Sequence, residues 1–431
     1  MVNITTKIKS IYINNEPLTD QDKQVSRKLS IFEGCTARTI GTLTSGAFLV
    51  GFAKLLGSSD QIAGTIAAIP VLAGIVMVIS PIVLERMENR KFIVTLFCLI
   101  GRLMLGSMIL IPLMNISYQM KIVILILTFL IANLFISFSL PAAQTWLQAV
   151  TPEEIRGKYF GKRESIVLGV VTIVTLLMGQ ILDKFKQIGQ QFSGFIVVYI
   201  VVIISAVVNF IIFSNMREPK SKVADTPPAL KQVLTMPLGN NKFMRVVLLL
   251  IIWNFGFQLG WPFTAVYMVS TLKLGYGLIT IMAVLASITS VIFVRYWGRL
   301  ADKKSWLYLM KLMTILQILS FISWFLINKY SVLLLLPVSH ILSGAAISGI
   351  NISVNNLQYS YAPKENKTVY IGFSSAISSI FGFCGTLCGA SVLKITEQYK
   401  VTLGGLSIGN IQILFLVSSI ILIGCFFCVK G

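Results

Sequence analysis

Polar side chains recur at helical spacing inside segments that are otherwise apolar. Two of these segments carry three such residues at i, i+4 and i+7. The two sets are Asn254, Gln258 and Trp261, and Asn351, Asn355 and Gln358. Residues at this spacing share one face of an α-helix, and polar groups at membrane depth face a bundle interior rather than lipid. Amides and an indole bind through hydrogen bonds, so these faces predict a site that holds an organic solute.

Two further apolar segments carry a similar stripe. Arg38, Thr42 and Ser45 repeat the spacing, and Gln144 and Gln148 stand one helical turn apart. The four segments together predict a central cavity lined by polar groups. Its candidate substrate residues are Arg38, Thr42, Gln144, Gln148, Asn254, Gln258, Trp261, Asn351, Asn355 and Gln358. The alternative is that each amide only ties two helices together, an interaction worth about 0.6 kcal/mol on average in membrane proteins.

Three charged residues lie inside the apolar segments of the N-terminal half. Arg38 needs an acid, a carbonyl or an anionic substrate at that depth. Glu33, five residues earlier, is one candidate partner, although i, i+4 spacing would suit a pair better. Glu33 and Arg102 are a second candidate charge pair, and Arg102 could instead steer an anion. His340, the single histidine, is expected to pack or to hydrogen-bond rather than to sense protons.

The composition identifies the elements that must position these residues. The chain is 55% hydrophobic and 12% charged, whereas soluble domains carry about 25% charged residues. A net charge of +20 does not indicate a nucleic-acid partner, because the basic residues fall between apolar segments. Runs of about 20 apolar residues span a bilayer as helices. The predicted spans are 31–56, 61–84, 91–114, 120–149, 162–184, 193–214, 243–269, 275–299, 306–328, 331–361, 368–393 and 407–429.

The segments between the spans predict the topology. Most of the 36 Lys and Arg fall on one side, and the positive-inside rule places that side and both termini in the cytoplasm. The polar N-terminal stretch has no short apolar core, so no cleavable signal peptide is expected. The predicted organisation is a cytoplasmic arm over 1–28, a six-helix bundle over 29–214, a cytoplasmic loop over 215–242 and a second six-helix bundle over 243–431.

The two halves carry related segments at matching places. "PIVLERMENRK" follows the second span, and "GRLADKK" follows the eighth. "TPEEIRGKYFG" follows the fourth span, and "APKENKTVYIG" follows the tenth. Agreement at two independent places indicates parallel internal repeats. Thr151, Pro152 and Glu154 also fit a helix start, with Thr151 as the N-cap of a capping box.

This pattern resembles the major facilitator superfamily of secondary transporters. The resemblance covers residues from about 30 to 429, and "GRLADKK" is a close match to the family's conserved loop. In the first copy Pro81 and Glu88 stand where the family has glycine, and Glu85 replaces Asp and keeps its negative charge. The resemblance implies an all-α membrane protein of two pseudo-symmetric six-helix bundles. It also implies that spans 1, 4, 7 and 10 line the cavity.

The resemblance further implies two gates on the cytoplasmic side. Glu85 is expected to face the start of span 11, and Asp302 the start of span 5. A carboxylate beside a helix N-terminus is stabilised by about 0.3 to 1 kcal/mol. The alternative is that these charges only anchor the span ends at lipid headgroups. The candidate gating residues are Glu85, Arg86, Arg90 and Arg156 in the first half, and Gly298, Asp302 and Lys303 in the second.

The predicted function is secondary transport of a small amphipathic or anionic organic solute by alternating access. We expect a monomer in the cytoplasmic membrane, embedded in the lipid bilayer and coupled to protons or sodium. Export is slightly favoured because the sequence shows few charges in the cavity. A lipid or lysolipid flippase and a non-transporting receptor on the same fold are the alternatives. No nucleophile and base set, metal cluster or phosphate loop is recognisable, so we expect no enzyme activity, cofactor, metal or nucleic-acid partner.

Overall fold

A computed structural model gives the fold. The structure describes residues 18–84, 86–87, 89–219, 230–363, 367–397, 401–403 and 406–428. Within these residues, eleven helices are long and apolar enough to cross a membrane, and Gly46–Leu55 is a shorter apolar helix. These helices form the predicted all-α arrangement of twelve spans, apart from a short antiparallel hairpin that pairs Val401 with Ile408. The predicted gating residue Glu85 lies outside the described residues.

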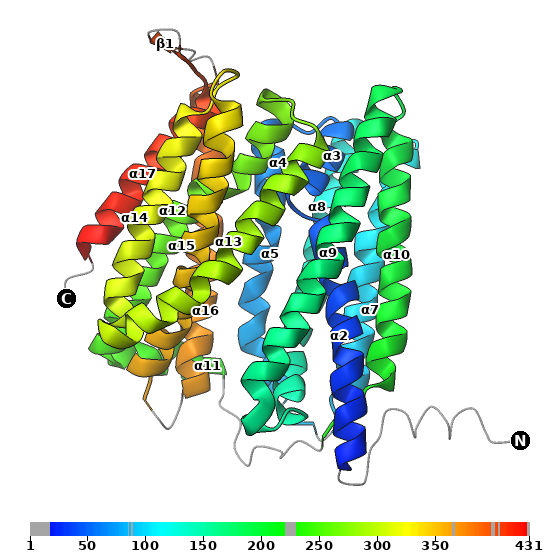
Figure 1. The fold of residues 1–431 in the computed structure, drawn as a ribbon, viewed down its shortest axis with the longest axis vertical. Helices are drawn as coiled ribbons and strands as arrows, with labels where there is room; N and C mark the ends of the chain where they lie inside the picture. The colour runs from blue at the N-terminus through cyan, green and yellow to red at the C-terminus, as the bar shows by residue number, and fades with distance from the viewer. Residues whose placement is uncertain are drawn as a thin grey trace, which may run out of the picture. The chain divides into compact units, whose positions relative to one another are not determined.

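The helices group into two compact units, and each is described by itself. The first unit holds most of the N-terminal half. In Figure 1 its helices α2, α7, α9 and α10 run alongside one another, as their mutual packing requires. Its helices are α2 (Asp20–Leu43), α3 (Gly46–Leu55), α6 (Ile79–Leu84), α7 (Lys91–Ser107), η2 (Met108–Leu113), α8 (Tyr118–Ala149), η3 (Glu153–Ile155), α9 (Arg156–Gln187) and α10 (Gln191–Asn215).

The second unit holds the C-terminal half together with residues Gly57–Ile75. The 3-10 segment η1 (Gly74–Val78) contains the point at which the chain passes from one unit to the other. The elements of the second unit are α4 (Asp60–Ala67), α5 (Ile69–Ala73), α11 (Leu230–Thr235), η4 (Met236–Gly239), α12 (Asn241–Val266), η5 (Tyr267–Thr271), α13 (Tyr276–Lys303), α14 (Trp306–Leu326), α15 (Val332–Tyr361), α16 (Lys367–Ile395), β1 (Val401–Leu403), β2 (Leu406–Ile408) and α17 (Asn410–Cys428).

The first predicted span is two helices rather than one. A capping box starts α2, in which the Thr19 hydroxyl accepts from the Asp22 amide and the Asp22 carboxylate accepts from the Thr19 amide. The helix ends at Leu43, and α3 begins at Gly46, whose φ of +52° suits glycine. The span therefore bends just after the stripe that carries Arg38 and Thr42.

The second predicted span is also broken. Pro70 lies in the first turn of α5, and the 3-10 segment η1 separates α5 from α6. Helix α4 packs closely on α12, because a Cβ at Gly64 would lie 2.1 Å from Phe263 Cε1. The predicted bundle boundaries follow chain order, whereas packing groups α4 and α5 with the second unit.

Two local predictions were wrong. The segment "GRLADKK" was expected to form a loop, but α13 continues through Lys303, so Gly298, Asp302 and Lys303 lie in its last turns. The Thr151 hydroxyl was expected to cap the following helix, but it donates to the Leu147 carbonyl at 2.8 Å. That bond closes the preceding helix instead, and α9 begins at Arg156 without a side-chain cap.

Candidate functional site

The polar stripe of α2 faces open space. Arg38 and Gly41 are exposed, and Thr42 and Ser45 are half-buried. A Cβ at Gly41 would meet no described atom within 4 Å. The hydroxyl of Thr42 donates to the Arg38 carbonyl at 2.9 Å. A charge exposed inside a membrane requires water around it.

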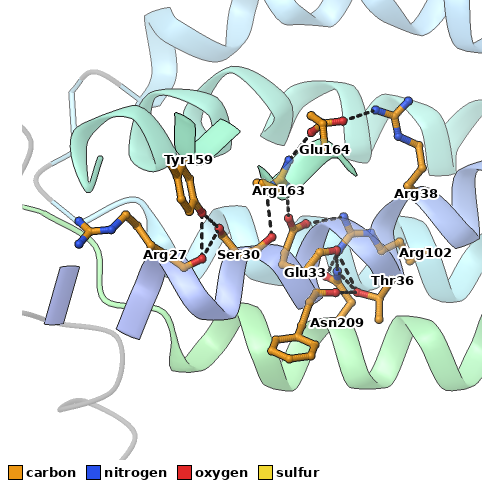
Figure 2. A network of polar contacts seen from close by, with 11 residues as sticks. Arg27, Ser30, Glu33, Thr36, Arg38, Arg102, Tyr159, Arg163, Glu164 and Asn209 are labelled. Carbon is orange, nitrogen blue, oxygen red and sulfur yellow. Dashed lines mark hydrogen bonds and ion pairs between the residues drawn. The ribbon is translucent and has the colours of Figure 1, made fainter. Parts of the chain in front are cut away.

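Five charged side chains form a continuous series that ends at Arg38. Arg102 Nη2 lies 3.4 Å from Glu33 Oε1, and Arg163 Nη2 lies 3.3 Å from Glu33 Oε2. Arg163 Nη1 lies 2.7 Å from Glu164 Oε1, and Arg38 Nη2 lies 3.4 Å from Glu164 Oε2. Figure 2 shows Arg163 between the two glutamates and Arg38 at the far end. We call this series of three arginines and two glutamates the charge chain.

The charge chain runs from the interior of the first unit to its surface. The exposed fractions of the side chains are 9% for Arg102, 17% for Glu33, 13% for Arg163, 51% for Glu164 and 63% for Arg38. Charges are costly to bury unless they are paired and hydrogen-bonded. The three inner members therefore serve as fixed partners of one another, whereas the outer two can reach a solute.

Neutral polar groups fasten the buried end of the charge chain. Asn209 of α10 accepts a hydrogen bond from Arg102 through its side-chain oxygen. Its amide nitrogen donates to the Glu33 carbonyl at 3.1 Å and to Thr36 Oγ1 at 2.7 Å. Asn209 is fully buried, and Figure 2 shows it beneath Glu33 and Thr36. These bonds tie α2, α7 and α10 together around one carboxylate.

The middle of the charge chain depends on a glycine. Arg163 Nε donates to the Ser30 carbonyl at 3.1 Å, which draws the guanidinium across α2. A Cβ at Gly34 would lie 2.6 Å from Arg163 Nη2 and 2.9 Å from a Val167 methyl carbon. Glycine at this position therefore allows α9 to approach α2 closely enough for Arg163 to reach Glu33.

The structure gives Arg38 a partner that the sequence did not indicate. The predicted pairing of Arg38 with Glu33 is replaced by a pair with Glu164 on α9. Glu33 instead lies between Arg102 and Arg163, so Glu33 and Arg102 are brought together as a charge pair. Arg163 and Glu164 were missed because they fall near the start of an apolar segment, where charges usually mark a span end. Their distance from the helix start could have indicated a site: Glu164 lies about 12 Å along α9 from its first residue, Arg156.

The amides of α8 add a second exposed polar face to the first unit. Gln144 and Gln148 stand one turn apart and are both exposed. Helix α8 continues unbroken through Pro141, one turn before Gln144. Their exposure suits a solute contact, and Asn133 on the same helix instead donates to its own Phe129 carbonyl.

The predicted stripes of the second unit divide into two groups. Asn351 and Asn355 are exposed on α15. Gln358 is buried and donates to Ser374 at 2.9 Å, which ties α15 to α16. Gln258 is also buried, and a Cβ at Gly382 of α16 would lie 3.3 Å from Gln258 Cγ.

The remaining predicted residues of α12 lie beside this contact. Asn254 donates to the Leu250 carbonyl of its own helix at 2.9 Å. Trp261 stacks on Phe257, with ring centroids 5.1 Å apart and planes at 22°, and Phe257 stacks in turn on Trp253. Trp261 is half-buried, so one part of this aromatic ladder remains accessible.

The predicted gating residues lie at the ends of helices. Arg86, Asp302 and Lys303 are exposed. The backbone amide of Arg90 donates to Glu218 at 3.0 Å. Arg156 Nη1 lies 3.6 Å from Glu153 Oε1 in an i, i+3 pair.

Two further predicted features concern metals and the single histidine. The described residues contain no group of three His, Cys, Asp or Glu side chains that could hold a metal ion. His340 Nδ1 lies 2.9 Å from the Leu336 carbonyl, and its ring contacts Trp324. Local hydrogen bonding and packing therefore account for His340.

Comparisons with known proteins identify the fold. The sequence matches the family profile described as Major Facilitator Superfamily over residues 34–386. A search of curated proteins finds no match. The nucleoside transporter NupG, crystallised as a point mutant, is 14% identical with a TM-score of 0.73, and the match covers 95% of this chain and 98% of that chain.

Two other solved structures are similar over comparable lengths. A D-xylose-proton symporter is 12% identical with a TM-score of 0.67, covering 94% of this chain and 96% of that one. A bacterial homolog of the human lysosomal transporter Spinster is 14% identical with a TM-score of 0.64, covering 95% and 96%. At these identities the likeness is one of fold.

Proposed function

The chain belongs to the major facilitator superfamily, and we propose that it is a secondary transporter for a small amphipathic organic solute that carries an anionic group. Arg38 anchors that group. Alternating access exposes the site to each side of the cytoplasmic membrane in turn, and both termini lie in the cytoplasm.

One observation supports this proposal most strongly. The Arg38 and Glu164 side chains are 63% and 51% exposed, although Glu164 lies within an apolar helix long enough to cross a membrane and Arg38 lies near the end of α2, just before the apolar helix α3. An exposed ion pair at this depth requires an aqueous surrounding. A guanidinium in such a place offers a planar set of donors that matches carboxylate, sulfonate or phosphate oxygens.

The other parts of the predicted site supply neutral contacts. Gln144 and Gln148 in the first unit, and Asn351 and Asn355 in the second, present exposed amides. Trp261 is half-buried and is proposed to contact the apolar part of a solute. We assign Gln258 and Gln358 to helix packing, because both are buried between helices. Substrate selectivity then follows from one charge and several amides.

The charge chain removes the reason for favouring export over uptake. Export was favoured on the premise that the cavity lacks charged sites, and the exposed Arg38–Glu164 pair removes that premise. A secondary transporter moves solute in the direction set by its coupling gradient. The charged ends of the helices, including Arg86, Arg156, Asp302 and Lys303, are proposed to stabilise the cytoplasmically closed state.

Flux into proteoliposomes tests the proposed function. Naphthalenesulfonate is a suitable amphipathic probe, since it stays ionised and does not cross a bilayer as a neutral acid. Wild-type proteoliposomes should exchange labelled sulfonate, whereas protein-free liposomes should not. Arg38→Ala should slow the sulfonate exchange about tenfold, the loss expected for one hydrogen-bonded charge contact. Arg245→Ala is a control, because Arg245 is exposed at the start of α12. Equal exchange by Arg38→Ala and wild type would contradict the proposal.

A further inference from the structure

We infer that the solute is a zwitterion, and that its cationic group binds Glu164 while its anionic group binds Arg38. This inference rests on the proposed function and adds a substrate class to it. The class is a small amphipathic molecule that carries an amine and an acid close together. Glu164 is then the residue that distinguishes such a zwitterion from a simple anion.

The contact between Arg38 and Glu164 is one that a solute can replace. Arg38 Nη2 lies 3.4 Å from Glu164 Oε2, whereas hydrogen bonds between charged groups are usually about 2.7–2.9 Å long. Both side chains are more than half exposed, and exposed ion pairs of this kind contribute little to stability. The pair therefore offers a guanidinium and a carboxylate side by side on an accessible face of the first unit.

The Glu164 carboxylate is fixed from behind by Arg163. Arg163 Nη1 lies 2.7 Å from Glu164 Oε1, and the buried Arg163 is itself held by Glu33 at 3.3 Å and by the Ser30 carbonyl at 3.1 Å. Figure 2 shows Glu164 between Arg163 and Arg38. When a solute takes the place of Arg38, Glu164 keeps its contact through Oε1 and has Oε2 for a new partner. A carboxylate only accepts hydrogen bonds, so this partner is a donor, and a cationic donor binds it most strongly.

An anion without a cationic group suits this place less well. An anionic group bound to Arg38 lies beside Glu164 Oε2, and two negative charges at that separation repel each other. An ammonium group on the same solute turns this repulsion into an attraction. Arg38 and Glu164 together carry no net charge, and neither does a zwitterion. Each of the two charged side chains then has an opposite charge on the solute.

The distance between the two side chains limits the shape of the solute. Arg38 Nη2 and Glu164 Oε2 are close neighbours, and the hydrogen bonds that the solute makes to them are of similar length. The two charged groups of the solute must therefore lie about as close together as these two atoms do. An amine and an acid on the same carbon or on neighbouring carbons meet this condition, whereas groups at opposite ends of a ring do not.

Other acids near the pair cannot take this role. Both oxygens of Glu33 contact guanidinium groups, those of Arg102 and Arg163, and only 17% of its side chain is exposed. The packed helix α10 has no Asp or Glu between Gln191 and Asn215. Glu154 is exposed in η3, before the start of α9, and so lies outside the charge chain.

Binding of matched probes to the purified protein tests the inference. Phenylalanine is a zwitterion, and 3-phenylpropanoate lacks only its ammonium group. Isothermal titration should show wild type binding phenylalanine about tenfold more tightly than 3-phenylpropanoate, the gain expected for one charge-assisted hydrogen bond. The spacing is tested by 4-(aminomethyl)benzoate, which carries its charges at opposite ends of the ring and should bind no more tightly than 4-methylbenzoate.

Two variants assign the preference to Glu164. Glu164→Gln should bind phenylalanine no more tightly than 3-phenylpropanoate, because the amide carries no charge for the ammonium group. The same variant should bind naphthalenesulfonate at least as tightly as wild type does, which shows that its Arg38 site is intact. Glu154→Gln removes an exposed acid outside the charge chain and should keep the tenfold preference.

The outcomes distinguish the two proposals. Equal affinity of wild type for phenylalanine and 3-phenylpropanoate overturns the zwitterion inference, and the transporter proposal stands if naphthalenesulfonate still exchanges in proteoliposomes. An undiminished preference for phenylalanine in Glu164→Gln also overturns the inference, as does loss of naphthalenesulfonate binding by that variant. Absence of sulfonate exchange in wild type overturns the proposed function, and this inference with it.

Discussion

Gly34 and Arg163 are in such close contact that a Cβ on Gly34 would lie 2.6 Å from the guanidinium Nη2. The two residues belong to α2 and α9, and the contact sets how near these helices come. Arg163 in turn joins the buried Glu33 to the exposed Glu164. A residue without a side chain thereby determines the geometry of the charge chain.

Replacing this glycine should disturb the charge chain. Gly34→Ala must displace Arg163 or Val167, and overpacking of this kind costs about 1–3 kcal/mol. We expect a lower thermal unfolding midpoint for the purified protein, measured by intrinsic fluorescence. Gly41→Ala is the matched control on the same helix, because its Cβ would meet no described atom within 4 Å. An equal unfolding midpoint for the two variants would show that α9 can move away from α2 without loss of stability.

Removing the shared carboxylate should be more damaging than removing a surface acid. Glu33→Gln leaves the buried Arg102 without its ionic partner and Arg163 with Glu164 alone, and the expected loss is about 3–5 kcal/mol. Glu153→Gln removes an exposed i, i+3 pair with Arg156, and pairs of that kind contribute about 0–1 kcal/mol. Denaturant unfolding in detergent measures both. Similar losses in the two variants would contradict the assignment of Glu33 as the fixed centre of the chain.

Hydropathy and charge placement predict the spans, the two related halves and the polar face of α2. They do not predict which residue pairs with Arg38, because the rotation of α9 against α2 depends on the packing at Gly34. Nor does spacing distinguish Gln358, bonded to Ser374 inside the second unit, from the exposed Asn355 one turn earlier. The continuation of α13 through Asp302 was also missed, since charged residues after an apolar run indicate a span end equally well in a loop or a helix.

The segment that follows α10 should give the protein a pH-dependent stability. Glu218 is buried, and it accepts hydrogen bonds from the backbone amides of Arg90 at 3.0 Å and Lys91 at 2.8 Å. Burial raises the pKa of Glu218 above its ordinary value, and the two amides oppose that rise.

The folded protein therefore holds a proton on Glu218 more tightly than the unfolded chain does. Stability should fall as the pH rises from the ordinary glutamate pKa of about 4.3 to the raised pKa of Glu218. Glu218→Gln stays neutral and should lack this part of the pH dependence. The melting temperature of wild type and variant is measured across this pH range. If the two melting temperatures change with pH in the same way throughout the range, the role assigned to Glu218 is contradicted.

The packing of α4 against α12 should depend on Gly64 and Phe263. A Cβ at Gly64 would lie 2.1 Å from Phe263 Cε1, and Phe263 is fully buried. Gly64→Ala should therefore destabilise the protein by about 1–3 kcal/mol. Phe263→Leu frees space at the same contact, so the double variant should lose less than the sum of the two single losses. A strictly additive loss in thermal unfolding would show that the two residues act independently.

Binding by the purified protein tests the central claim, that Arg38 anchors an anionic solute, most directly. Isothermal titration compares naphthalenesulfonate with naphthalenesulfonamide for wild type, Arg38→Lys and Arg38→Gln. Wild type should prefer the sulfonate by about tenfold or more, as expected for a charge-assisted hydrogen bond. Arg38→Lys should keep part of this preference, and Arg38→Gln should lose it while its affinity for the sulfonamide stays unchanged. An undiminished preference for the sulfonate in Arg38→Gln would contradict the account.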